Sequence, residues 1–94
     1  DRNLAGGNTD MTLPTIHLNG TSQEALIDDA RTAYSALDEA VKALCRMHPH
    51  GRDYYPAPGT WDAASDEHDT RIQAVQGVMS EIGSWAKQVS LLQR

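Results

Sequence analysis

The chain has 94 residues, a formal net charge of −5, one cysteine and no phenylalanine, and its acidic excess is spread along the sequence. No stretch gathers the Lys and Arg residues that a sequence-independent grip on nucleic-acid phosphates requires, so direct nucleic-acid binding is not expected. A single cysteine excludes an internal disulfide framework, and no apolar run approaches membrane-spanning length. These features predict one small domain in a reducing compartment, which we take to be the cytoplasm.

Residues 1–12 are predicted to form an irregular tail, and residues 13–94 a single domain. The first ten residues are rich in Gly and Asn, and Met11 resembles a natural start, so these ten are expected to be an added or upstream segment. From Pro14 onward apolar and polar residues alternate. This pattern predicts an extended arm or short strand that places Ile16 and Leu18 on one face and ends in an Asn19-Gly20 turn.

A first helix is predicted at about residues 22–47. The sequence Thr21-Ser22-Gln23-Glu24 matches a capping box with Thr21 as the N-cap, and Leu18 is expected to anchor the helix entry. Pro49 ends the helix, because a proline disfavours helical geometry at the residue before it. Steps of four and three residues define the predicted apolar seam: Leu26, Ala30, Ala33, Leu37, Ala40, Leu44 and Met47.

A second helix is predicted at about residues 61–92, starting near Thr60 or Trp61. Its Gly77 and Gly83 each cost about 1 kcal/mol of helix propensity relative to Ala. Either another helix approaches closely at these glycines or they lie on an exposed face that tolerates them, and the sequence leaves both interpretations open. The predicted seam consists of His68, Ile72, Val75, Met79, Ile82, Ala86 and Val89.

Two amphipathic helices joined by a loop at 48–60 predict an all-α fold, an antiparallel helical hairpin with an extended N-terminal arm. A hairpin cannot cover both apolar stripes by itself, and Trp85, Val89 and Leu92 would remain partly bare. We therefore expect a homo-oligomer, a dimer or a larger assembly, in which hairpins pack into a helical bundle.

Residues suited to metal binding or catalysis are few. Cys45, His48 and His50 provide only one half of a typical zinc site, so Cys45 is expected to face the core and the two histidines to be solvated. Cys45 also lies near the negative end of a helix dipole, which disfavours a thiolate. Since no nucleophile elbow, Walker loop or GxGxxG motif is present, no metal, cofactor or enzymatic activity is predicted.

The strongest candidates for a binding site lie in the connecting loop and at the start of the first helix. In the loop, Arg52 can hold a phosphate or carboxylate with two parallel hydrogen bonds, and tyrosines can stack on a planar ring. The start of a helix offers free backbone amides to an anion. Because the two groups lie at opposite ends of a hairpin, only an antiparallel second copy could join them at a subunit interface. The predicted ligand-binding residues are Asn19, Gly20, Thr21, Ser22, His50, Arg52, Tyr54 and Tyr55.

The same residues also have a purely structural interpretation. Thr21 would only cap a helix, Arg52 would pair with Asp53 or cap the last carbonyls of the first helix, and the tyrosines would close the end of the bundle. His68 is expected to be a hydrogen-bonded core histidine rather than a ligand. The sequence does not choose between binding and structural roles for the loop.

Two motifs resemble small uncharacterised proteins of tailed bacteriophages and prophages, over residues 13 to about 90. They are Ile16-His17-Leu18-Asn19-Gly20-Thr21-Ser22 and Gly51-Arg52-Asp53-Tyr54-Tyr55-Pro56. The resemblance assigns no functional residue. By analogy with small helical phage oligomers, it implies an anti-defence protein in the host-cell cytoplasm that sequesters a small anionic, nucleotide-like signal. The alternative is an interaction module whose acidic helical surface docks a host or virion protein.

Overall fold

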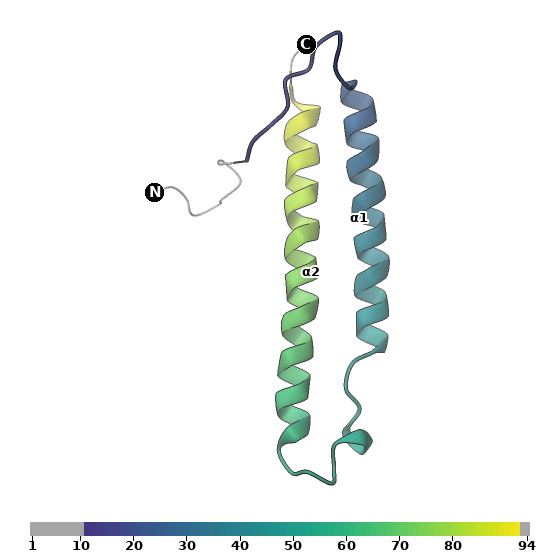
Figure 1. Ribbon diagram of the computed structural model, residues 1–94, viewed down its shortest axis with the longest axis vertical. Helices are drawn as coiled ribbons and strands as arrows, with labels where there is room; N and C mark the ends of the chain where they lie inside the picture. The colour runs from purple at the N-terminus through teal and green to yellow at the C-terminus, as the bar shows by residue number, and fades with distance from the viewer. Residues whose placement is uncertain (1–10, 93–94) are drawn as a thin grey trace, which may run out of the picture.

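The computed structural model describes residues 11–92, and the predictions for residues 1–10 lie outside that range. Two long helices run antiparallel, α1 at Gln23–Arg46 and α2 at Thr60–Ser90, with a short 3-10 helix, η2, at Gly51–Asp53 between them (Figure 1). No strand occurs within residues 11–92. The predicted all-α hairpin with an extended N-terminal arm is confirmed, whereas its assembly into a bundle remains a prediction.

The start of α1 differs from the predicted capping box. Ser22, and not Thr21, is the N-cap, because the helix begins at Gln23. The Ser22 hydroxyl accepts a hydrogen bond from the amide of Ala25, three residues on, at 3.1 Å. The C-terminal end of α1 lies where the sequence predicts it. The Met47 amide donates to the carbonyls of Ala43 and Leu44 and so completes the last turn.

The start of α2 depends on a glycine and a threonine. Gly59 precedes the helix with a φ of 85°, a left-handed conformation that residues with a Cβ rarely adopt. The hydroxyl of Thr60 donates to the carbonyl of Ala57 at 2.6 Å. Asp62 in the first turn and Lys87 in the last turn match the helix dipole. Within residues 11–92, neither helix is long and apolar enough to cross a membrane.

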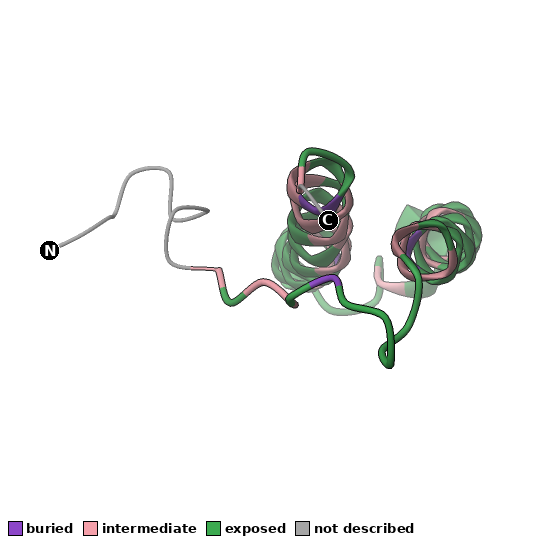
Figure 2. Ribbon diagram, turned by 90° about the horizontal axis from the view of Figure 1, so that it is seen from above, coloured by how far each residue is buried: buried purple, intermediate pink, exposed green. Residues whose placement is uncertain are grey.

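The hairpin has a thin core. Within residues 11–92, only Ile16, Ala30, His68 and Val89 are buried. Figure 2 shows only short buried segments, in purple, among residues that are exposed or intermediate. Two helices meet along a single line, so each buries only the narrow strip that faces the other. Three members of the predicted α1 seam therefore lie exposed: Ala33, Ala40 and Met47.

The N-terminal arm crosses the C-terminal part of α2 before the chain enters α1 (Figure 1). Ile16 is buried, but Leu18 is 98% exposed, so the predicted shared face and the Leu18 anchor are both wrong. The reason is a turn in which the Gly20 amide donates to the His17 carbonyl at 3.1 Å. Alternation holds only in extended chain, and the chain stops being extended after His17.

Gln23 fastens the open end of the hairpin. Its side-chain amide, at the first position of α1, donates to the carbonyls of Val89 at 2.7 Å and Leu92 at 3.1 Å. Val89 lies in the last turn of α2, where its carbonyl also accepts from the Leu92 amide at 3.1 Å, and Leu92 follows the end of the helix. One side chain therefore binds two carbonyls at the C-terminal end of α2 and ties the helices together.

Gly77 lies on an exposed face of α2, and a Cβ added there would meet no atom within 4 Å. We expect Gly77→Ala to raise the free energy of unfolding by about 1 kcal/mol, because alanine favours the helix and restricts the unfolded chain. Urea titration followed by circular dichroism measures this change. A loss of stability would instead indicate that Gly77 makes room for another molecule.

Candidate functional site

The predicted binding residues form two groups at opposite ends of the hairpin (Figure 1). The entry turn, Asn19–Ser22, leads into α1, and the loop group, His50, Arg52, Tyr54 and Tyr55, surrounds η2. The 24 residues of α1 between them span about 36 Å at 1.5 Å per residue. One copy of the chain therefore cannot hold a small ligand with both groups.

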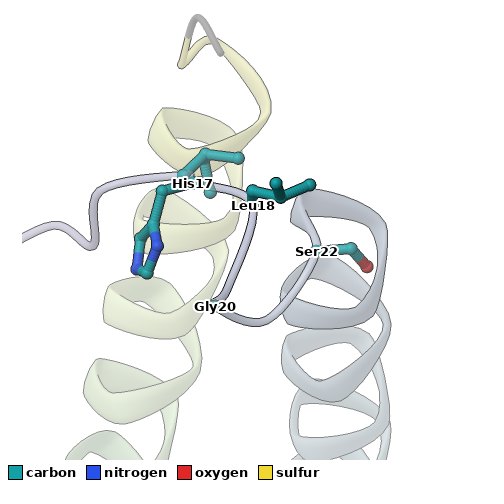
Figure 3. A pocket seen from close by; sticks show the side chains of 5 residues that line it. His17, Leu18, Gly20 and Ser22 are labelled. Carbon is teal, nitrogen blue, oxygen red and sulfur yellow. The ribbon is translucent and has the colours of Figure 1, made fainter.

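A shallow pocket of about 340 Å³ lies beside the entry turn. Figure 3 shows the ring of His17 on the α2 side of this pocket, whereas the side chain of Ser22 extends on the α1 side. The Ser22 hydroxyl already caps α1, so it serves the helix rather than a ligand. The pocket is lined by Ile16, His17, Leu18, Gly20 and Ser22.

Three of these lining residues, Ile16, His17 and Leu18, are absent from the predicted site. The ring of His17 folds back over Gly20, and a Cβ added to Gly20 would lie 2.7 Å from the His17 Nε2. Glycine therefore suits this close approach of a side chain to backbone. The Asn19-Gly20 pair predicts a turn from the sequence, but the pair does not indicate which side chain lies over that turn.

The loop group contains one charged side chain without a partner. Within residues 11–92, the guanidinium of Arg52 makes no hydrogen bond or ion pair, so the alternative pairing with Asp53 is not formed. The backbone amide of Arg52 donates to His50 Nδ1 at 3.2 Å, which makes His50 the side-chain cap of η2. Tyr54 is half-buried, and Tyr55 is 78% exposed.

His68 is buried and hydrogen-bonded, as its position in the apolar seam predicts. Its Nε2 lies 2.6 Å from the carbonyl of Leu44, and its Nδ1 lies 3.2 Å from the guanidinium of Arg71. A carbonyl accepts and a guanidinium donates, so these partners fix the tautomer with hydrogen on Nε2. His68 thus caps the C-terminal end of α1 from the neighbouring helix.

His48 was expected to be solvated, but it packs edge-on against His68, with ring centroids 5.6 Å apart. Its Nε2 lies 3.2 Å from the Asp69 carboxylate and 3.4 Å from the Ser65 hydroxyl. Its Nδ1 lies 3.3 Å from the carbonyl of Pro49. The ring therefore connects the segment after α1 to the first turns of α2.

This combination of serine, histidine and aspartate does not have the geometry of a catalytic triad. A triad requires the hydroxyl at one ring nitrogen and the carboxylate at the other. Ser65 and Asp69 both approach the same nitrogen of His48. The arrangement holds the loop against α2 and does not activate the serine.

Cys45 is exposed, so the expectation that it faces the core is wrong. The two helices meet along a line that includes Leu44, whose carbonyl contacts His68, and the next residue of α1 turns away. Within residues 11–92, no three His, Cys, Asp or Glu side chains gather closely enough to hold a metal ion.

No protein-family model, curated protein or solved structure matches the chain. The chemistry of the candidate site must therefore be inferred from its own residues. At the loop end, a free guanidinium lies in the same segment as an exposed phenol, a combination that can hold an anion and stack on a planar ring. At the other end, the entry turn provides backbone amides at the positive end of α1.

Proposed function

We propose that this chain is a self-associating helical protein that binds a small anionic, nucleotide-like ligand between two copies. The observation that carries the proposal is the unpaired guanidinium of Arg52, exposed in a loop with the open ring of Tyr55. If this loop lay beside the entry turn of a second, antiparallel copy, a phosphate could accept two parallel hydrogen bonds from the Arg52 guanidinium. It could also accept from the backbone amides at the start of the partner's α1.

The uncovered apolar surface supports self-association. A domain of this length is marginally stable alone, and the hairpin buries few of its apolar side chains. A second hairpin would cover both helices and would also supply the missing half of the binding site. The large apolar side chains exposed within residues 11–92 are Leu18, Tyr34, Met47, Tyr55, Trp61, Val78 and Leu91.

The resemblance to phage proteins supports a role against host defence in the cytoplasm of the infected cell. Sequestering a nucleotide signal requires affinity and a high protein concentration, but no turnover. An arginine and tyrosines suit this task, since they bind phosphate and base without a nucleophile or a general base. The proposed activity is therefore binding rather than catalysis.

The test is native mass spectrometry after incubation with a pool of linear and cyclic nucleotides. We expect Arg52→Ala to weaken binding about 100-fold, equivalent to about 3 kcal/mol, because a bidentate charged contact is lost. The number of subunits should not change. Arg52→Lys should bind with intermediate affinity, because lysine keeps the positive charge but cannot make the two parallel hydrogen bonds of a guanidinium.

Arg46→Ala is the matched control, because it removes one positive charge from an exposed residue outside the predicted site. Binding that survives Arg52→Ala, or falls equally in both variants, would contradict the proposal. If no nucleotide adds mass to the wild-type protein, the proposal fails as well.

A protein-docking role is the second candidate. Within residues 11–92, Asp62, Asp66 and Glu67 on the first turns of α2 have no ion-pair partner. Unpaired carboxylates on one stretch of helix suit a basic surface of a host or virion protein. This candidate gains support if the wild-type protein binds no nucleotide and Asp66→Ala reduces capture of such a partner.

A further inference from the structure

A shallow apolar groove of about 190 Å³ lies between the N-terminal half of α1 and the C-terminal part of α2, in the half of the hairpin nearer its open end. The ring of Tyr34, 43% exposed, forms one wall. Gly83 lies opposite, and a Cβ added there would be 3.6 Å from the Tyr34 ring, so larger side chains would fill the groove. Its other apolar lining residues are Ile27, Ala30, Ile82 and Ala86.

The charges along α1 beside this groove form a pattern that is complementary to itself. Asp28, Arg31, Asp38 and Lys42 follow one another at steps of three, seven and four residues, which keep them on one edge of the helix. Their signs run minus, plus, minus, plus, and Tyr34 lies near the middle. Read from the opposite end, the signs are inverted.

Within one copy these charged groups pair only locally. Arg31 contacts Asp28 at 3.0 Å, and Lys42 contacts Asp38 and Glu39, each at 3.3 Å. The hydrogen bond with Asp38, followed by that with Glu39, raises the pKa of the Lys42 ammonium, so Lys42 is charged at neutral pH. All these pairs are exposed, and exposed pairs are weak enough to exchange partners.

We infer that this face is a two-fold interface, in which a second copy packs its α1 antiparallel to the first. The axis passes near Tyr34 and Ser35, so the two Tyr34 rings meet close to the axis, each at the edge of the other copy's groove. Arg31 then lies opposite Asp38 of the partner copy, and Asp28 opposite Lys42 of the partner copy. Both contacts occur twice, because a two-fold interface repeats every pair.

The size of the face is adequate for a dimer. A 24-residue helix is about 36 Å long, and two packed helices are about 20 Å wide. The resulting area, about 700 Å², approaches the roughly 800 Å² per partner that stable complexes bury. A central tyrosine surrounded by apolar residues and flanked by charges also matches the usual anatomy of such interfaces.

The same axis joins the two halves of the proposed binding site, a step that rests on the proposed function. From the axis, Ser22 lies about 19 Å along α1 in one direction, and the end of α1 that precedes His50 lies about as far in the other. The entry turn of one copy therefore becomes level with the loop group of its partner. Two ligand sites per dimer result.

The experiment uses two charge-reversed variants, Arg31→Asp and Asp38→Arg, studied by sedimentation equilibrium. Alone, each variant places two like-charged pairs in its own interface, and we expect its dimer dissociation constant to rise at least tenfold. Mixed in equal amounts, the two variants form opposite-charged pairs only. The mixture should regain most of the wild-type affinity as a heterodimer.

Asp66→Arg is the matched control, since it makes the same charge reversal on an exposed residue of α2 away from the groove, and its dimer should dissociate as the wild type does. Circular dichroism verifies that each variant is helical. Tyr34→Ala should weaken the dimer without any change in charge. The proposed interface is wrong if mixing the two variants does not restore dimer affinity, or if the wild-type protein is monomeric at 100 μM.

The two proposals fail in different ways. If mixing restores the dimer but no nucleotide binds, the interface stands and the proposed function is wrong. If nucleotide binding depends on Arg52 but mixing the two variants does not restore dimer affinity, the proposed function stands and the copies meet through another face.

Discussion

His68→Ala is expected to lower the free energy of unfolding by about 3 kcal/mol, a large part of the stability of so small a domain. The His68 side chain is only 1% exposed, so its removal leaves a cavity between the helices. It also removes a donor to the Leu44 carbonyl, which keeps only the Met47 amide, and leaves the Arg71 guanidinium without its ring partner. Urea titration at a fixed protein concentration measures the change.

Two variants make this prediction specific. His17→Ala removes an exposed imidazole and should change the free energy of unfolding by less than about 0.5 kcal/mol. His68→Gln keeps an amide donor and should lose less than His68→Ala. A loss below about 1 kcal/mol for His68→Ala would show that the hairpin does not depend on this contact.

Gln23→Glu is expected to cost about 2 kcal/mol of unfolding free energy near neutral pH. The change preserves shape, but it replaces a donor by a carboxylate facing the carbonyls of Val89 and Leu92. A negative charge near the start of α1 is favourable with respect to the helix dipole, which offsets part of the loss. Below about pH 4 the carboxyl regains a proton to donate, so the difference from the wild-type protein should shrink.

Gln73→Glu is the matched control, because the same chemical change falls on an exposed residue of α2. Its unfolding free energy should stay within about 0.5 kcal/mol of the wild-type value. Equal losses in both variants would indicate that the added charge, rather than the broken hydrogen bonds, destabilises the protein. Chemical denaturation at pH 7 and pH 4 separates the two causes.

The proposed site illustrates how far residue types alone can lead. The chemistry of Arg52 and Tyr55 predicts that they bind a ligand, and the structure leaves both side chains open at the loop end. His50 and Ser22 are predicted on the same grounds, yet each of these side chains accepts a hydrogen bond from a nearby backbone amide. Chemistry identifies which groups can bind a ligand, but local capping decides which remain free to do so.

Leu18 and His48 show where pattern reasoning fails in this chain. Leu18 satisfies the alternation of the arm, but the turn after His17 directs it into solvent. His48 follows the end of α1 and looks like a solvated loop residue, but the return of α2 places His68 and Asp69 beside it. The error for Leu18 arises from a change of backbone direction. The error for His48 arises from a contact between residues that are far apart in the sequence.

The sequence by itself determined the two helices and their hairpin, because the signals for these are local. Apolar spacing marks each helix, and Pro49 lies beyond the end of α1. Only the tertiary structure decided that His68 caps α1, that Gln23 closes the open end, and that a groove remains beside Tyr34. These features depend on the rotation and register of one helix against the other, which a periodic apolar stripe leaves free within about one turn.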